Sequence, residues 1–210
     1  MNGTESNSGK THKDLFAALR ADEQETMDRL RARLVAGAED AGILDVAYRT
    51  LDTAVGTLLL AATERGLVRI AYESEDHDAV LQGLVEKVSP RILHAPARLD
   101  LVAHQFEEYF AGTRRAFEVP LDFRLATGFR LGVLRHLTDI GYGHTESYTQ
   151  VAAAAGSPRA VRAVGSACAN NPLPVVVPCH RVVRADGSFG GYVGGPEAKH
   201  TLLTLEGAAA

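Results

Sequence analysis

The stretch at residues 174–183 restricts the fold of this chain more than any other, and it reads PVVVPCHRVV. The apolar run at 174–177 is typical of a buried strand, and a second, short apolar pair follows at 182–183. The prolines restrict the backbone around Val177 and Cys179 and favour a turn there. Within this stretch, the thiol of Cys179 is followed directly by the imidazole of His180 and the guanidinium of Arg181. This is a setting for a nucleophile.

A cysteine that attacks needs a nearby base or positive charge, because a free thiol with a pKa of about 8.5 is mostly protonated at neutral pH. His180 and Arg181 are the candidates for that help. Adjacent residues of an extended strand point to opposite faces, so the sequence order does not bring Cys179 against His180. A buried structural cysteine is the alternative, and residues 174–183 alone leave both interpretations open.

Length and cysteine content limit the architecture. A chain of 210 residues with 46% hydrophobic content can bury a core in one domain or in two small ones. Its two cysteines, Cys168 and Cys179, form neither a CxxC pair nor a cluster with histidines at zinc spacing. We therefore expect no disulfide framework, no metal and no organic cofactor. The N-terminus has no signal pattern and no apolar run reaches membrane length, so we expect a cytoplasmic protein with no membrane partner.

The charge differs between the two halves of the chain. Residues 1–121 carry 14 Lys and Arg against 20 Asp and Glu, a balance of -6, and residues 122–210 carry 8 against 6, a balance of +2. The second half is the one that can face phosphates. Because the excess is small, we expect modest, salt-sensitive affinity from few phosphate contacts.

The N-terminal part divides into a polar tail and a helical extension. Residues 1–12 are polar and predict a disordered tail. Residues 13–43 predict two helices, with Leu15, Phe16 and Leu19 in the first, with Met27, Leu30 and Leu34 in the second, and with Asp22 and Glu25 as its capping box. The pair either packs on its own protein or binds a protein partner, and we favour the first.

Residues 44–123 have the pattern of a small α/β domain. The β-prone runs at 45–51, 57–63 and 67–72 are separated by turn sequences and predict an antiparallel meander. Residues 76–88 and 99–110 have helical spacing, and residues 117–123 predict a returning strand. No chemistry is visible in this part.

Residues 124–210 are richer in motifs. Helical patterns at 129–140 and 149–155 are followed by Gly156, and Ser157 with Pro158 predicts the start of a further helix. Helix, glycine turn and helix together are typical of a helix-turn-helix. In the last helix Ala160, Ala163 and Gly165 allow close approach to another surface, either a neighbouring helix in the core or an external partner.

The chain from Phe129 to Glu206 resembles the O6-alkylguanine-DNA alkyltransferases. The matching pieces occur in the order and spacing of that family: Ser147-Tyr148, Gly156-Ser157-Pro158, Arg162-Ala163-Val164-Gly165, Asn171-Pro172, Pro178-Cys179-His180-Arg181-Val182, Gly191-Tyr192, Gly194-Gly195, Lys199, Leu202-Leu203 and Glu206.

This resemblance implies roles for the catalytic residues. Cys179 takes the alkyl group, His180 is its base through a water, and Glu206 orients His180. Tyr148 donates to a ring nitrogen of the guanine, and Asn171 holds the turn before the cysteine.

The resemblance also implies how the lesion is reached. The small-residue helix, with Ser157, Ala160, Ala163 and Gly165, enters the minor groove of double-stranded DNA, and Arg162 fills the gap left by the rotated nucleotide. The glycine-rich loop at 187–195 lacks a phosphate-binding motif, and the resemblance implies that it lines a base pocket, with a surface loop as the alternative. Val193 stands where some members carry a serine, which puts the substrate range in question. The pocket residues are Pro174, Val182, Gly190, Tyr192 and Val193.

The fold implied is α/β (α+β), with an RNase H-like domain at 44–123 and a helical catalytic domain of winged-helix-like type at 124–210. The activity implied is a single-use transfer of the alkyl group from O6-alkylguanine, with O4-alkylthymine as a further candidate, by a monomer. A non-catalytic lesion-recognition module is the alternative, and a cysteine hydrolase is a third hypothesis, which multiple turnovers distinguish from a single transfer.

Overall fold

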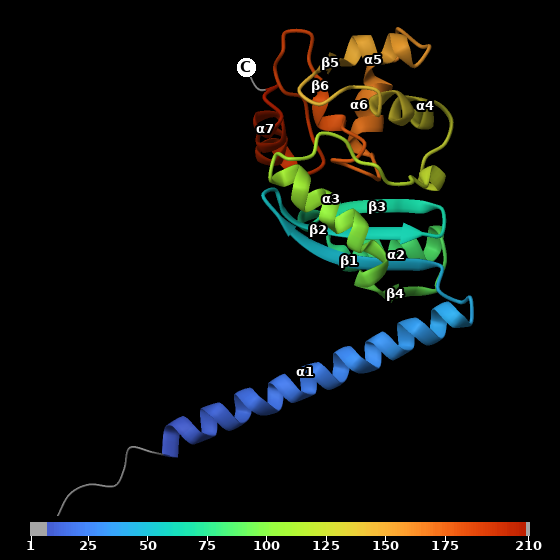
Figure 1. Cartoon of the computed structure of the whole chain (residues 1–210). Helices are drawn as coiled ribbons and strands as arrows, with labels where there is room; N and C mark the ends of the chain where they lie inside the picture. The colour runs from blue at the N-terminus through green and yellow to red at the C-terminus, as the bar shows by residue number, and fades with distance from the viewer. Residues whose placement is uncertain (1–7, 209–210) are drawn as a thin grey trace, which may run out of the picture. The chain divides into compact units, whose positions relative to one another are not determined.

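The computed structural model describes residues 8–208, without the side chains of 8–15, 18, 19, 21, 22 and 24. The chain forms two compact units, Met1–Leu44 and Asp45–Ala210. Figure 1 shows the helices and strands of both units. Among the described residues, no helix is long and apolar enough to cross a membrane.

The described part of the first unit, residues 8–44, contains one helix, α1 (Ser8–Asp40). The predicted disorder is therefore wrong for residues 8–12, and residues 1–7 lie outside the described part. The predicted break at Asp22 is also wrong, because no proline or glycine between Gly9 and Gly37 interrupts the good helix formers. Of the predicted apolar positions, Leu15 and Leu19 lie outside the described side chains. The others are 47 to 58% exposed, namely Phe16, Met27, Leu30 and Leu34.

The second unit begins with a four-stranded sheet in the order β3-β2-β1-β4. The strands β1 (Val46–Thr53), β2 (Gly56–Thr63) and β3 (Gly66–Tyr72) form the predicted antiparallel meander. Strand β4 (Ile92–His94), which pairs parallel to β1, was not predicted. The strand predicted at 117–123 is wrong. Only a bridge between Leu67 and Leu121 forms there, because Pro120 has no N–H with which to extend a ladder.

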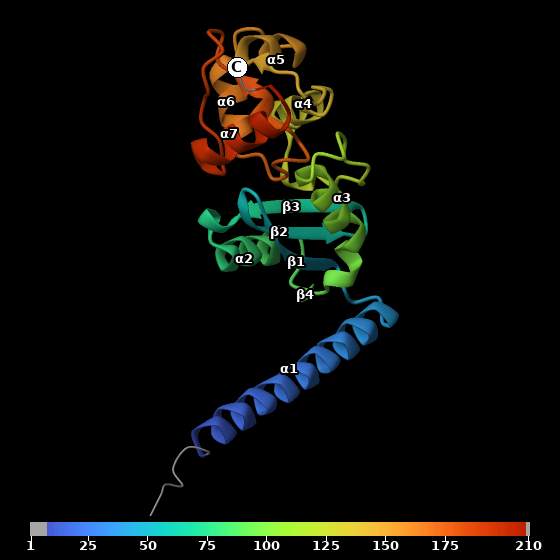
Figure 2. The same ribbon diagram turned by 60° about the vertical axis from the view of Figure 1, so that its left-hand side comes forward.

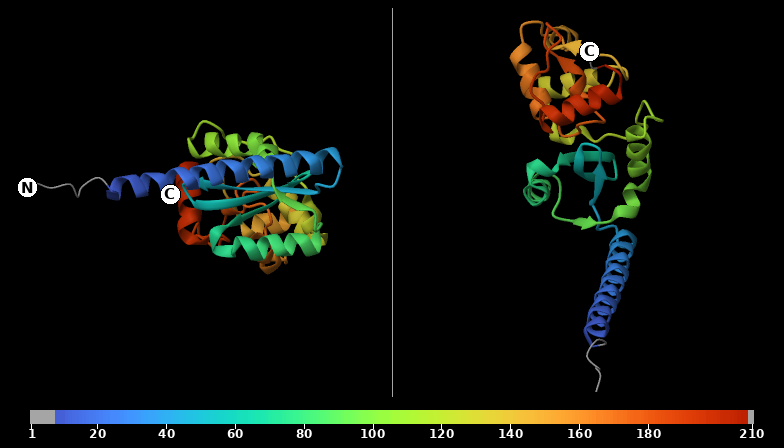
Figure 3. Two further views of the ribbon diagram at one scale, coloured as in Figure 1. Left: turned by 90° about the horizontal axis from the view of Figure 1, so that it is seen from below. Right: turned by 90° about the vertical axis from the view of Figure 1, so that its left-hand side faces the viewer.

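Helices cover both faces of this sheet, so its strands are apolar on both sides. Helix α2 (His77–Lys87), capped by the Asp76 side chain, places Leu84 against one face, on Val46, Leu59 and Val68. Helix α3 (Asp100–Phe110) follows the short turn η2 (Pro96–Leu99) and lies on the opposite face, as Figures 2 and 3 show.

The rest of the second unit is mainly helical. It contains α4 (Gly128–Leu137), α5 (Tyr148–Ala154), α6 (Val161–Ala169) and α7 (Gly195–Leu205). The short strands β5 (Glu146–Ser147) and β6 (Val182–Val183) pair in parallel beside them. A mixed sheet between helices, followed by a helical part, confirms the predicted α/β fold class.

The turn between α5 and α6 differs from the prediction. Gly156 has a φ of 77° and ends α5, as a helix-turn-helix requires. Ser157 does not cap the next helix, because residues 157–159 form a turn of their own in which the Ala160 N–H donates to the Ser157 carbonyl at 2.8 Å. Helix α6 begins at Val161 with Ala160 as its N-cap residue.

Candidate functional site

The approach to Cys179 is a series of turns, and the strand predicted for residues 174–177 is wrong. Val175 has a φ of 73°, a conformation that costs a β-branched residue about 1–3 kcal/mol. The Val177 N–H donates to the Leu173 carbonyl at 2.8 Å, which closes one turn. Pro178, with φ -81° and ψ 62°, is the centre of an inverse γ-turn in which the Cys179 N–H donates to the Val177 carbonyl.

Asn171 stabilises these turns from inside. Its side-chain amide donates to the Val177 carbonyl at 2.8 Å and to the sulfur of Cys179 at 3.1 Å. Its carbonyl oxygen accepts from the Leu173 N–H at 3.0 Å. Since Asn171 is 1% exposed, these contacts occur away from water, where they are strongest.

The Cys179 thiol is almost enclosed, with 2% of the residue exposed. Burial raises its pKa to about 11, against the opposing effects of the Asn171 hydrogen bond and the positive charge of Lys199. Lys199 is itself buried and donates to the Val182 carbonyl at 2.6 Å. The thiol is therefore protonated at neutral pH and needs a base to react.

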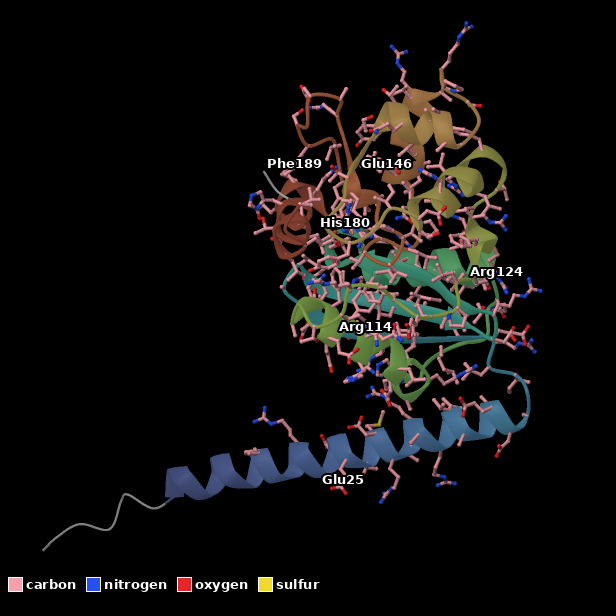
Figure 4. All side chains as sticks on the ribbon, turned by 45° about the horizontal axis from the view of Figure 1, so that its top comes forward. Glu25, Arg114, Arg124, Glu146, His180 and Phe189 are labelled. Carbon is pink, nitrogen blue, oxygen red and sulfur yellow. The ribbon has the colours of Figure 1, made fainter. Side chains whose placement is uncertain are left out.

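His180 lies inside the same short turn, η4 (Cys179–Arg181), and is 0% exposed. Its Nε2 lies 2.9 Å from Glu206 Oε1, so an ionised Glu206 keeps the proton on Nε2 and leaves the lone pair on Nδ1. Within residues 8–208, no protein atom pairs with that buried Nδ1. Burial lowers the pKa of His180 below its ordinary value. Figure 4 shows His180 among the packed side chains near helix α7.

Glu206 lies just after α7 and accepts from several donors. Arg181 donates to it twice, from Nε to Oε2 and from Nη2 to Oε1, each at 2.9 Å. Arg181 also donates to the Ile140 carbonyl, so it supports the carboxylate rather than the thiol, which corrects its predicted help to Cys179. Burial raises the pKa of Glu206, but the hydrogen bonds from His180 and Arg181 outweigh burial and lower it to about 2.

Two further donors reach the carboxylate: the Gly143 N–H, which donates to Oε2 at 3.4 Å, and a residue of helix α3. The hydroxyl of Tyr109 donates to Glu206 Oε1 at 2.6 Å, and the residue is 0% exposed. The helical pattern of residues 99–110 predicted that Tyr109 is buried, but not that it reaches the candidate site. A tyrosine in the apolar stripe of a helix indicates a polar partner inside the protein, because a buried hydroxyl needs a hydrogen-bond partner. This signal was available in the sequence.

The residues predicted to line a base pocket lie around the same turn. Pro174 and Val182 are buried, whereas Tyr192 and Val193 are partly exposed. The backbone of Gly190 runs so close to Tyr148 that an added Cβ would lie 2.2 Å from the tyrosine oxygen. Tyr148 begins α5, whose capping box is formed by Ser147 and Gln150, and burial raises its pKa.

Tyr72, at the end of β3, also belongs to the wall of the candidate base pocket, because it contacts the pocket residue Tyr192. The sequence did not predict this. Its hydroxyl lies 2.9 Å from that of Tyr192, and the two rings meet edge to face at 5.8 Å. A Cβ on Gly194 would lie 2.5 Å from the ring of Tyr72. The ring of Tyr192 in turn meets His180 edge to face at 6.2 Å.

Helix α6 presents small side chains to solvent. Ala163 and Ser166 are exposed together with Arg162, whereas Val164 and Ala167 are buried. Gly165, in the middle of the same helix, and Ala160 and Ser157, just before it, are partly exposed. An exposed helical face without bulky groups can approach another surface closely.

The charged residues described in the structure do not gather into a metal centre. Among residues 8–208, no group of three or more His, Cys, Asp or Glu side chains has the arrangement of a metal site. The second cysteine, Cys168, is buried in α6 at 4% exposure, and burial raises its pKa.

Comparison with known proteins identifies the family. The ribonuclease-like domain of 6-O-methylguanine DNA methyltransferase matches residues 46–123, and the DNA binding domain of the same family matches residues 128–208. A methylated-DNA–protein-cysteine methyltransferase of Mycolicibacterium paratuberculosis is 38% identical over 161 residues, 77% of this chain and 92% of the relative. The chain belongs to the 6-O-methylguanine DNA methyltransferase family.

Further members of this methyltransferase family agree in sequence and in fold. The constitutive methylated-DNA–protein-cysteine methyltransferase of Bacillus subtilis is 39% identical over 163 residues, 76% of this chain and 94% of the relative. A crystal structure of the Mycobacterium tuberculosis O6-methylguanine methyltransferase matches with a TM-score of 0.68 and 36% identity, covering 79% of this chain and 94% of the other. A Mycobacterium tuberculosis structure in complex with DNA matches with a TM-score of 0.66 at 37% identity, covering 78% and 94%.

Proposed function

We propose that this methyltransferase repairs DNA by moving the alkyl group of O6-alkylguanine onto the sulfur of Cys179. The observation that carries the proposal is the state of His180. Its Nε2 is fixed by Glu206 at 2.9 Å, while its buried Nδ1 has no protein partner in the described part of the chain. A water on Nδ1 can connect the base to the neighbouring thiol, because a buried ring nitrogen needs a partner.

The proposed step is an in-line displacement. The Cys179 proton passes through the water to His180 Nδ1, and Glu206 stabilises the imidazolium that forms. The thiolate attacks the alkyl carbon, a carbon–sulfur bond forms, and the bond from that carbon to O6 breaks. Its electron pair stays on the guanine, where the Tyr148 hydroxyl donates to a ring nitrogen. Asn171 and Lys199 favour the thiolate during the step.

The stoichiometry follows from the product. A thioether at Cys179 is not readily reversed, so each protein molecule acts once. The low basicity of His180 also suits this role, since a base with a pKa below its ordinary value is neutral at physiological pH.

We also propose that helix α6 binds the minor groove and that the damaged nucleotide rotates out of the duplex. Its exposed small residues, Ala163 and Ser166, support a close approach, and the exposed Arg162 of the same helix would fill the vacated position. The enclosed position of Cys179 supports the same view, because a base inside a duplex cannot reach it. Arg162→Ala is expected to weaken DNA binding and to reduce the rate of transfer.

Intact-mass spectrometry tests the transfer directly. The protein is mixed with an equimolar duplex that carries one O6-methylguanine, and the reaction is followed by peptide mapping. We expect one added methyl group on Cys179 and none on the Cys179→Ala variant. Cys168→Ala is the matched control, because this second buried cysteine is not among the groups that shift the pKa of His180 or Glu206, and it should still transfer one methyl group.

The same measurement separates the alternative. An unchanged mass together with lesion-specific binding would overturn the transfer and leave a recognition module. Repeated methyl loss from excess duplex would instead indicate a hydrolase.

A further inference from the structure

Tyr109 connects the sheet-bearing part of the second unit to the proposed relay. It belongs to α3, which packs on the sheet of β1–β4, whereas Glu206 follows α7 in the helical part. The Tyr109 hydroxyl donates to Glu206 Oε1 at 2.6 Å, shorter than the 2.9 Å from His180 to the same oxygen. One carboxylate oxygen therefore faces the base, the neutral hydroxyl of Tyr109 and the charged Nη2 of Arg181, which donates to it at 2.9 Å. The contacts of Tyr109 and His180 share this oxygen.

The shared oxygen makes the two contacts interdependent. A hydrogen bond from Tyr109 takes up part of the negative charge on Oε1, and that charge is what stabilises protonated His180. Tyr109 can only act as a donor here, because burial and the nearby Glu206 charge raise the pKa of its hydroxyl far above its ordinary value. The hydroxyl therefore lowers the basicity of His180 and fixes the position of Oε1.

We propose that Tyr109 is a positioning residue that tunes the relay, acting through Glu206 on the basicity of His180. The inference rests on the proposed function, since it assumes that His180 takes the thiol proton. It assigns to the ribonuclease-like part a role in the chemistry, in addition to its support of the fold.

The charged and titratable groups around the relay come from several elements, and only Tyr109 among the tyrosines described in the structure contacts the carboxylate. The groups around His180 and Glu206 are Cys179 and Arg181 of η4, Lys199 of α7, Tyr192 of the glycine-rich loop, Tyr109 of α3 and Tyr142 after α4. Arg115, after α3, lies over the ring of Tyr142, 5.7 Å from its centroid.

Tyr142 provides a matched control. It lies 6.1 Å from Tyr109 between ring centroids, and its hydroxyl donates to the Leu205 carbonyl at 2.8 Å. That acceptor is one residue before Glu206 along the chain. Tyr142→Phe therefore removes a hydroxyl from the same cluster without removing a donor to the carboxylate.

The test is the rate of methyl transfer from an O6-methylguanine duplex as a function of pH, for the full chain and for Tyr109→Phe and Tyr142→Phe. Without the Tyr109 hydroxyl, Oε1 offers more charge to His180, the protonated imidazole is stabilised, and its pKa rises. Transfer needs neutral His180, so the acid limb of the Tyr109→Phe profile should move to higher pH by about half a unit to one unit. The Tyr142→Phe profile should coincide with that of the unchanged protein.

The outcomes are distinguishable from failure of the proposed function. If the unchanged protein transfers no methyl group, the proposed function fails. If it does, and the Tyr109→Phe profile is either unchanged or lowered equally at every pH, the tuning role is wrong. Should Tyr109→Phe lose its circular-dichroism signal, a fluorotyrosine at position 109 keeps the hydroxyl and makes it a stronger donor. The acid limb must then move to lower pH, and no movement would overturn the inference.

Discussion

The side-chain amide nitrogen of Asn171 lies 3.1 Å from the sulfur of Cys179 and donates a hydrogen bond to it. The same nitrogen also holds the Val177 carbonyl, so a single side chain sets both the turn and the environment of the thiol.

Asn171→Ala should both destabilise the protein and slow transfer. Three buried hydrogen bonds disappear, which should lower the free energy of unfolding by about 2–4 kcal/mol. The thiolate also loses a donor, so methyl transfer should slow by roughly 10-fold or more. Urea unfolding and single-turnover kinetics measure the two effects. Asn170→Ala is the control, because Asn170 is exposed and its amide contacts only the Ser166 carbonyl; an equal loss in both variants would contradict the role of Asn171.

Glu206 should make the protein sensitive to acid. Its pKa is about 2 in the folded protein, against an ordinary value of 4.5, so its contribution is present above pH 4.5 and is lost as the pH falls towards 2. The shift corresponds to roughly 3 kcal/mol. In Glu206→Gln, unfolding near neutral pH should be easier by about 3–5 kcal/mol, because Arg181 stays buried without a charged partner. Urea midpoints between pH 7 and 3 should fall less steeply for this variant, and parallel curves would argue against the assignment.

Gly190→Ala should impair transfer through Tyr148. An added Cβ would lie 2.2 Å from the tyrosine oxygen, so the ring must move from its place in the pocket wall. A displacement of this size should slow transfer by about 100-fold. Gly191→Ala is the matched control, since no neighbouring atom lies within 4 Å of its added Cβ. The comparison uses single-turnover rates at saturating duplex, and similar rates for both variants would show that Tyr148 tolerates displacement.

The hydroxyl contact between Tyr72 and Tyr192 should hold the pocket wall in place. Tyr72→Phe and Tyr192→Phe each remove one side of the 2.9 Å contact, so each should weaken the reaction with damaged duplex by a few fold. Because both changes break the same contact, the double variant should be no slower than the slower single variant. A double-mutant cycle on transfer rates measures this coupling. Independent, multiplying effects would mean that the two hydroxyls do not act together.

Much of the sheet was predictable from local pattern. The three runs of β1–β3 alternate with turn sequences. The helix that follows them, α2, begins after Asp76 and ends before Pro90. The strand predicted at 174–177 failed for a local reason as well. A valine run favours a strand, but Val175 adopts a φ of 73° between two prolines, in turns that the nearby side chain of Asn171 helps to stabilise.

The candidate site was predictable only in part. Cys179 and His180 are adjacent and suggest a nucleophile and base, but Glu206 followed from a family resemblance and not from any local pattern. The role of Tyr109 was out of reach, since it is separated from Glu206 by 97 residues. Periodicity predicts that such a side chain is buried, whereas the partner of its hydroxyl depends on how α3 packs against the end of α7.

The enclosure of Cys179 bears on how long an unused molecule stays intact. With 2% of the residue exposed and a pKa of about 11, the sulfur is neither accessible nor ionised at neutral pH. Peroxide and stray electrophiles in the cell react with exposed thiolates, so they find a poor target here. If each molecule reacts only once, as we propose, this enclosure protects it from being consumed by the wrong reagent before it meets damaged DNA.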